Sequence, residues 1–170
     1  LNVYLVDHYV PQEICVTSYE ALSIKDFPFR SYVVACRHDR GRPEICEQRI
    51  VQNPLNVIDQ TDHFLPYWPQ TNLIPRDNRR QHLVENIAFK GRPQNLAPPF
   101  REAEFHQRLQ EIGLSFQISP KENLANRKDW RDYKTVDIVL AVRNSTEYDL
   151  SIKPPSKLIN AWIAEVPALL

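Results

Sequence analysis

The stretch VDIVLAV at residues 136–142 is almost continuously apolar and rich in β-branched side chains. Such a run is typical of a strand that is buried on both faces of a sheet. A helix that starts after two prolines is expected over about residues 155–164, and another strand begins at Val166. Strands that alternate with helices indicate a parallel sheet, so this stretch predicts an α/β fold.

The residues before this stretch continue the alternation of strands and helices. Residues 85–91 predict a strand that ends in a glycine turn, and residues 114–118 alternate apolar and polar side chains as a strand does. Between them, apolar residues at helical spacing predict a helix over about residues 101–112, with Gly113 at its C-terminal cap. The second half of the chain is therefore predicted to be a Rossmann-like parallel sheet with helices on both faces.

The first half of the chain predicts shorter elements. We expect strands over residues 2–7, 32–36 and 48–52, because these runs are rich in β-branched or aromatic side chains. A short helix is expected over residues 16–24. The first half is thus also predicted to be α/β.

A proline-rich segment separates the two halves. Prolines interrupt any regular element between residues 64 and 77, so we interpret this segment as an extended connector and as the domain boundary. The chain is accordingly divided into residues 1–80 and residues 81–170. The aromatic residues Tyr67 and Trp68 leave open the alternative that the connector is a protein-binding surface.

The composition argues against several classes of partner and site. The 170 residues include 21 Lys+Arg and 21 Asp+Glu, and this balance argues against a nucleic-acid partner, whose binding proteins usually show a basic excess. The three glycines, Gly41, Gly91 and Gly113, are far apart in the sequence. The chain therefore contains neither a Walker-type phosphate loop nor a G-x-G-x-x-G dinucleotide motif. Any phosphate must therefore be bound in another way.

Cysteine spacing and hydropathy bear on metal sites and on localisation. Three cysteines without C-x-x-C spacing indicate neither a disulfide framework nor a zinc site, so no metal is expected. No apolar stretch approaches the roughly 20 residues that span a bilayer, so we expect a cytoplasmic protein, while a peripheral membrane contact stays open. The lack of methionine and the strand-like end at residues 166–170 lead us to expect a piece of a longer protein.

Candidate binding residues follow from the predicted sheet, because open α/β sheets bind ligands at the carboxyl ends of their strands. Residues 90–92, Arg143 and residues 152–157 occupy such places. Lys153 and Lys157 lie where the dipole of the last helix attracts anions, so a phosphate or diphosphate would receive lysine charge and backbone N–H groups together. The alternative is that both lysines are solvated surface residues.

Segments of the second half resemble a known family. The sequence KPPSKLINAW at residues 153–162, followed by VPALL at residues 166–170, resembles the donor-site segment of GT-B-fold glycosyltransferases of the family 1 and family 4 type. The sequence IAFKGR at residues 87–92 resembles the first strand and glycine loop of the same nucleotide-sugar-binding domain. The resemblance covers about residues 83–170.

The resemblance implies a two-domain GT-B architecture and a transferase activity. Residues 1–80 would be the C-terminal part of an acceptor-side domain, and residues 81–170 the N-terminal part of the nucleotide-sugar-binding domain, which is cut short. The implied reaction moves a sugar from a nucleotide-sugar donor, which is a substrate, to a glycan, a lipid or a small molecule. No cofactor is implied.

The family's site residues are carried over to matching positions in this sequence. Lys153 and Lys157 would neutralise the donor phosphates, and Ser156 with the helix N-terminus would hydrogen-bond them. Arg143 would be a further contact to a phosphate or carboxylate, or else a surface ion-pair partner. Gly91, in a loop with Arg92, would let the backbone approach the donor or acceptor.

Two further residues bear on the chemistry. A general base is needed only if the transfer inverts the sugar configuration, and His8, after the first predicted strand, would be that base, or else an ordinary structural histidine. Glu165 stands where the family usually has glycine before Val-Pro. The alternative function is therefore a non-catalytic Rossmann-like binding or assembly domain, in which Glu165 marks a lost donor site.

Overall fold

The chain forms two compact units, each built on its own parallel sheet. The computed structural model describes residues 3–7, 10–11, 13–18, 21, 25, 30–37, 41–119 and 130–170. The first unit comprises Leu1–Tyr67 with Glu147–Pro154, and the second comprises Trp68–Thr146 with Pro155–Leu170. The fold is therefore mixed α/β, as predicted, and the first change of unit falls within the proline-rich connector.

The first unit contains a sheet of four parallel strands. They are β1 (Ile14–Ser18), β2 (Tyr32–Arg37), β3 (Gln48–Val51) and β4 (Asp62–Phe64), in the order β1-β2-β3-β4. A 3-10 helix η4 (Pro54–Asn56) joins β3 to β4. The helix α2 (Glu147–Ile152) also belongs to this unit.

Hydrogen bonds from the loop after β3 explain why α2 belongs to the first unit although it is distant in sequence. The side-chain amide of Asn53 donates to the carbonyl oxygens of Leu150 and Lys153, at 2.8 and 3.2 Å. Asn53 also accepts a hydrogen bond from the backbone N–H of Leu55 at 3.0 Å, which caps η4. One buried amide thus fixes both η4 and the end of α2.

The second unit contains the other four-stranded parallel sheet. Its strands are β5 (Asn86–Lys90), β6 (Ser115–Ser119), β7 (Ile138–Leu140) and β8 (Ala168–Leu169), in the order β6-β5-β7-β8. Helix α1 (Ala103–Glu111) precedes β6, and helix α3 (Ser156–Ile163) precedes β8. Three 3-10 helices complete the unit: η5 (Asn78–Arg80), η6 (Pro93–Asn95) and η7 (Pro98–Arg101).

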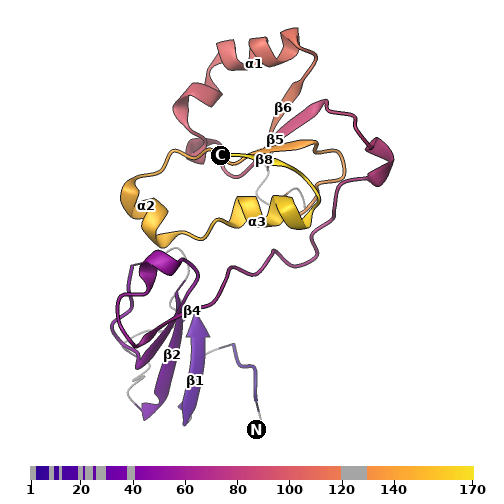
Figure 1. Ribbon diagram of the computed structural model, residues 1–170. Helices are drawn as coiled ribbons and strands as arrows, with labels where there is room; N and C mark the ends of the chain where they lie inside the picture. Colours follow the sequence, from indigo (N-terminus) through magenta and orange to yellow (C-terminus); the bar gives the residue numbers. More distant parts are fainter. Residues whose placement is uncertain are drawn as a thin grey trace. The chain divides into compact units, whose positions relative to one another are not determined.

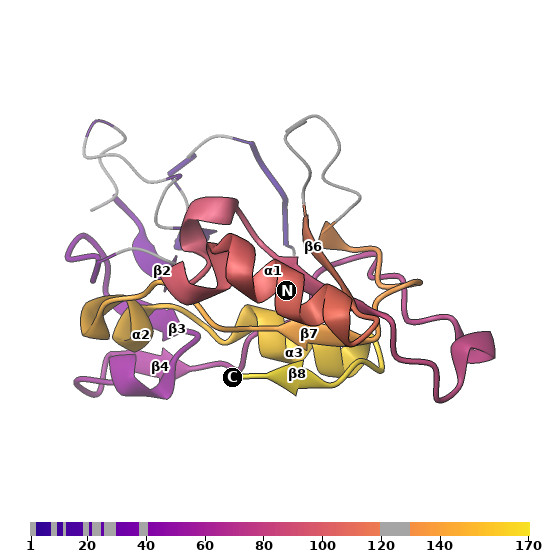
Figure 2. The same cartoon turned by 90° about the horizontal axis from the view of Figure 1, so that it is seen from above.

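Each face of the second sheet is covered by one helix, as predicted. Phe105 of α1 packs against the cluster formed by Ile87, Phe89 and their neighbours. Ala161 of α3 packs in a separate cluster with Ala88, whose side chain points to the opposite face of β5. Figure 1 shows α1 and α3 on opposite sides of the strands, and in Figure 2, seen from above, α1 lies in front of α3.

The structure confirms most of the predicted elements and corrects two. β3 and β5 lie within the predicted ranges 48–52 and 85–91, β2 extends one residue beyond the predicted range 32–36, and β6 and both long helices agree to within a few residues. Residues 3–7, however, form no strand, and Ile14–Ser18 is a strand where a helix was predicted from residue 16. The segment ICVTS is rich in β-branched side chains and pairs with β2, which favours the strand.

A buried carboxylate organises the amino-terminal edge of the second sheet. Asp137, whose side chain is fully buried, accepts hydrogen bonds from Arg76 and Arg80 and from the backbone N–H groups of Glu85 and Asn86, at 2.8 to 3.1 Å. Burial alone would raise the pKa of Asp137, but these hydrogen bonds outweigh it and hold the pKa well below its usual range. The network joins η5 to the starts of β5 and β7.

Candidate functional site

The strand order of the second sheet creates a topological switch point. From β5 the chain passes through α1 to β6 on one side, and later returns to β7 on the other side of β5. In open α/β sheets the loops after two such strands diverge, and the crevice between them binds ligands. In this sheet the two strands are β5 and β7, which are followed by residues 91–97 and by residues 141–146.

The loops after β5 and β7 are held together by backbone contacts. Leu96 and Arg143 form an isolated antiparallel bridge, and the N–H of Asn144 donates to the carbonyl of Asn95 at 3.0 Å. The Nε atom of half-buried Arg143 is shielded from solvent and has no hydrogen-bond partner among the described residues. Arg143 therefore lies at the switch point with one buried donor unused, which fits its predicted role as an anion contact.

Helix α3 begins at the same edge of the sheet. Because α3 precedes β8, and β8 is parallel to β7, the helix runs against the strands and starts at their carboxyl ends. Ser156 is the first helical residue, and the N-cap is Pro155, whose side chain makes no capping hydrogen bond. Ser156 thus does not act as the N-cap, and its predicted hydrogen bond to a phosphate at this helix start stays a prediction.

Two of the predicted site residues, Lys157 and Gly91, lie next to each other. A Cβ atom built on Gly91 would stand 3.0 Å from Cε of Lys157 and 3.3 Å from its Nζ. The same ammonium lies over the ring of Phe89, 5.0 Å from the ring centroid. Arg92, the next residue after Gly91, is exposed and is the N-cap of η6. The structure therefore brings Gly91, Arg92 and Lys157 to one edge of β5.

Lys153 has different surroundings. It belongs to the first unit, whereas Ser156 and Lys157 belong to the second. Its ammonium forms an ion pair with Asp149, one turn earlier in the chain, and both side chains are about three-quarters buried. The neighbouring carboxylate compensates the charge of Lys153. The predicted action of Lys153 together with Lys157 on one phosphate stays a prediction.

Two other predictions from the sequence stay predictions. His8 lies outside the described residues, so its role as a base stays a prediction. In the connector, Trp68 is exposed and Tyr67 half-buried, so the alternative of a protein-binding surface also stays a prediction.

Glu165 forms the tight turn between α3 and β8 despite the missing glycine. Its φ is +61°, a left-handed conformation that glycine adopts more easily. The N–H of Val166 donates to the carbonyl of Ala161 at 2.9 Å, and that of Glu165 to Trp162 at 3.0 Å, which is the Schellman pattern. Glu165 thus ends α3 at the helix terminus opposite to Lys157, about 12 Å away along a helix of eight residues. Its carboxylate therefore lies at the other end of α3 from the predicted phosphate site, and the alternative of a lost donor site stays a prediction.

Phe89 is the site residue that the sequence analysis missed. It is fully buried on β5, two residues before Gly91, and its ring lies beneath the Lys157 ammonium. The pattern of an aromatic residue two positions before a glycine at the end of a strand is visible in the sequence. The lysine that covers both residues comes from a helix 66 positions later, as counted from Gly91 to Lys157, and the sequence pattern does not predict that contact.

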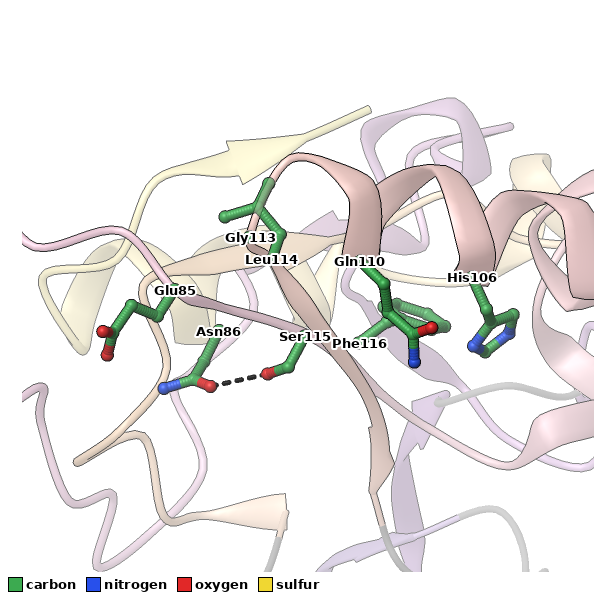
Figure 3. A pocket seen from close by; sticks show the side chains of 8 residues that line it. All are labelled: Glu85, Asn86, His106, Gln110, Gly113, Leu114, Ser115 and Phe116. Carbon is green, nitrogen blue, oxygen red and sulfur yellow. Dashed lines mark hydrogen bonds between the residues drawn. The ribbon is translucent and has the colours of Figure 1, made fainter.

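A separate open pocket of about 440 Å³ lies at the amino-terminal ends of β5 and β6. There the hydroxyl of Ser115 donates to the side-chain oxygen of Asn86 at 2.6 Å, and the rings of His106 and Phe116 meet edge to face (Figure 3). The pocket is at the opposite end of β5 from Gly91, so it is not part of the predicted donor site. Its lining residues are Glu85, Asn86, His106, Gln110, Gly113, Leu114, Ser115 and Phe116.

Within the described part of the chain, no group of three or more His, Cys, Asp and Glu side chains is placed to hold a metal ion. In the same residues, no helix has both the length and the apolar character needed to cross a membrane. Comparison of the chain with family models, with curated proteins and with solved structures finds no match.

Proposed function

We propose that the second unit is the nucleotide-sugar-binding part of a GT-B-type glycosyltransferase, and that the donor phosphates bind at Lys157 and the first turn of α3. The observation that supports this proposal best is the position of Lys157 beside Gly91, at the switch point of a parallel sheet. A lysine and the N–H groups at a helix start together suit a diphosphate. They replace the glycine-rich loop that the sequence lacks.

The proposed chemistry needs positive charge at this place. Transfer breaks the bond between the anomeric carbon and a phosphate oxygen, while the acceptor oxygen bonds to that carbon and loses its proton. Negative charge therefore develops on the leaving nucleoside diphosphate, and fixed cations and N–H groups stabilise it. Lys157 would supply positive charge, and Arg143 a second cation in the loop after β7. Lys153 belongs to the first unit and forms an ion pair with Asp149 there.

The remaining parts of the proposal follow from the resemblance. The first unit would belong to the acceptor-side domain of a two-domain GT-B enzyme, and the protein would act in the cytoplasm on a glycan, lipid or small-molecule acceptor. His8 would serve as base if the reaction inverts the sugar.

Binding of UDP and GDP to the full chain tests the phosphate site, with isothermal titration calorimetry as the measurement. Lys157→Ala is expected to weaken binding about 10- to 100-fold, because a hydrogen bond to a charged group contributes about 1.5–3 kcal/mol. Lys153→Ala is the matched control and is expected to change affinity much less. Equal losses in the two variants, or unchanged affinity in Lys157→Ala, would contradict the assignment.

A measurement of turnover distinguishes the proposed glycosyltransferase from the alternative of a non-catalytic binding or assembly domain. Release of UDP or GDP from the corresponding sugar nucleotides, measured with a coupled phosphate assay, is expected to depend on Lys157. Nucleotide binding without any release, across several sugars and acceptors, would favour the binding or assembly domain instead.

A further inference from the structure

We propose that the pocket at the amino-terminal ends of β5 and β6 is a binding site for a neutral sugar residue. The pocket lies wholly within the second unit, and its volume of about 440 Å³ is typical of small-molecule sites. It is at the other end of β5 from Gly91, so it is not the place of the proposed transfer. The inference does not depend on the proposed function, because other residues carry it.

A hydrogen-bonded pair at the start of two strands gives the pocket a donor next to an acceptor. Asn86 of β5 and Ser115 of β6 are register partners, and the Ser115 hydroxyl donates to Oδ1 of Asn86 at 2.6 Å. Because this bond uses the Asn86 oxygen and the Ser115 proton, Asn86 presents its amide N–H groups and Ser115 the lone pairs of its oxygen. Among the described residues, neither side chain makes a further hydrogen bond. A ligand here has to offer an acceptor and a donor side by side.

Helix α1 brings two more polar side chains to the pocket. His106 and Gln110 are one helical turn apart and lie on the same face of α1. Neither the side-chain amide of Gln110 nor the ring of His106 is hydrogen-bonded within the described part of the chain. In Figure 3 the side chains of Asn86, Ser115, Gln110 and His106 follow one another along the pocket. Groups that can still hydrogen-bond a ligand therefore reach one place from α1, β5 and β6.

The charges around the pocket favour a neutral ligand. An anion finds no lysine or arginine among the described residues that line the pocket, and α1 ends here, so its dipole repels negative charge. A cation is no better suited, because the Glu85 carboxylate is already paired with Arg80 at 3.2 Å. An ammonium also has only donors, so it would leave the N–H groups of Asn86 without an acceptor.

The apolar side chains favour a sugar over a flat base. Leu114 and Phe116 supply apolar surface, against which the C–H groups of a pyranose ring can pack. The rings of His106 and Phe116 meet at 71°, with centroids 5.2 Å apart, so they do not form the slot between parallel faces that a nucleobase would fill. Neighbouring sugar hydroxyls each donate and accept, which matches the pair of Asn86 and Ser115.

NMR of the ¹⁵N-labelled full chain tests this site, with the methyl glycosides of glucose, galactose, mannose and N-acetylglucosamine as probes. We expect at least one glycoside to shift the side-chain amide signals of Asn86 and Gln110, which are assigned by their loss in Asn86→Ala and Gln110→Ala. The probes carry no phosphate, so failure of the proposed donor site would not affect the result. If none of these glycosides shifts the two signals, or if adenosine or propylammonium does so at lower concentration, the proposal is wrong.

Two exposed glutamines of α1 provide a variant and its matched control. Gln110→Ala is expected to weaken binding of the glycoside about 3- to 10-fold, since a hydrogen bond between neutral groups makes a modest contribution. Gln107 lies on the same helix but donates to Glu111 at 3.1 Å and does not line the pocket, so Gln107→Ala should leave the affinity unchanged. Affinity is measured from the backbone amide shift of Ser115 during the titration. Equal affinities in the two variants place the glycoside elsewhere and overturn the inference.

Discussion

Replacement of Glu165 by glycine is expected to stabilise the second unit. The helix α1 offers an internal comparison, because it ends in the same Schellman pattern as α3. There the N–H of Leu114 donates to the carbonyl of Leu109 at 2.8 Å, and the left-handed position is Gly113, with φ of +77°. The two helices thus differ at this position in having glycine in one case and glutamate in the other.

The size of the expected gain in the free energy of unfolding follows from the backbone conformation of Glu165. A left-handed residue with a Cβ atom is disfavoured by about 1–2 kcal/mol. Glycine removes that strain but loses about 0.4–1 kcal/mol through its larger freedom in the unfolded chain. Glu165→Gly should therefore raise the free energy of unfolding by about 0.8 kcal/mol, or the melting temperature by about 2–3 °C. Gly113→Ala should lower it by a similar amount, since a Cβ there would meet nothing within 4 Å.

Tryptophan fluorescence during urea unfolding is a suitable assay, because Trp68, Trp130 and Trp162 all belong to the second unit. Glu165→Gln is the control, since it removes the carboxylate from the negative end of the helix dipole but keeps the Cβ atom. If Glu165→Gly stabilises no more than Glu165→Gln, the gain comes from charge and the argument from backbone strain is wrong.

Two further predictions concern titratable groups. Asp137→Asn should lower the free energy of unfolding by about 3 kcal/mol, because it leaves two half-buried arginines without their carboxylate, whereas Asp77→Asn, at an exposed ion pair, should change little. The folded-state pKa of Asp137 lies below its unfolded value near 3.9, so its contribution is present above about pH 4 and is lost as the pH falls; acid unfolding should be less steep in Asp137→Asn. Burial raises the pKa of the Cys15, Cys36 and Cys46 thiols, so their alkylation rate should continue to rise above pH 9.

Elements with a strong local pattern could be predicted from the sequence, and those that depend on distant contacts could not. The strand at Asn86–Lys90 and the helix at Ala103–Glu111 follow from apolar periodicity alone. The helix at Glu147–Ile152 was missed because its place is fixed by Asn53, which donates to Leu150 from 97 positions away. The structure of such a short segment is determined by its contacts with distant residues, which its own sequence pattern does not predict.

The candidate site shows the same limit. The rule for carboxyl ends of strands was sufficient to predict that Gly91, Arg143 and Lys157 would lie at one edge of the sheet. It could not predict that Lys157 would occupy the space above Gly91, since that depends on how α3 packs on β5 and β7. The pairing of Lys153 with Asp149 was visible as a spacing of four residues, but only if a helix had been predicted there.

The balanced net charge of the chain is compatible with several cations near one end of the second sheet. The described residues near its carboxyl edge include Arg92, Arg143 and Lys157, together with Glu102 and Glu104 at the start of α1, whereas Asp137 and Glu165 lie at the amino edge. Asp137 is fully engaged by arginines, so it does not counter the cations at the other edge. A neutral composition therefore argues against a surface that binds a long polyanion, yet it is compatible with a local site for a single diphosphate, whose charge two or three fixed cations can balance.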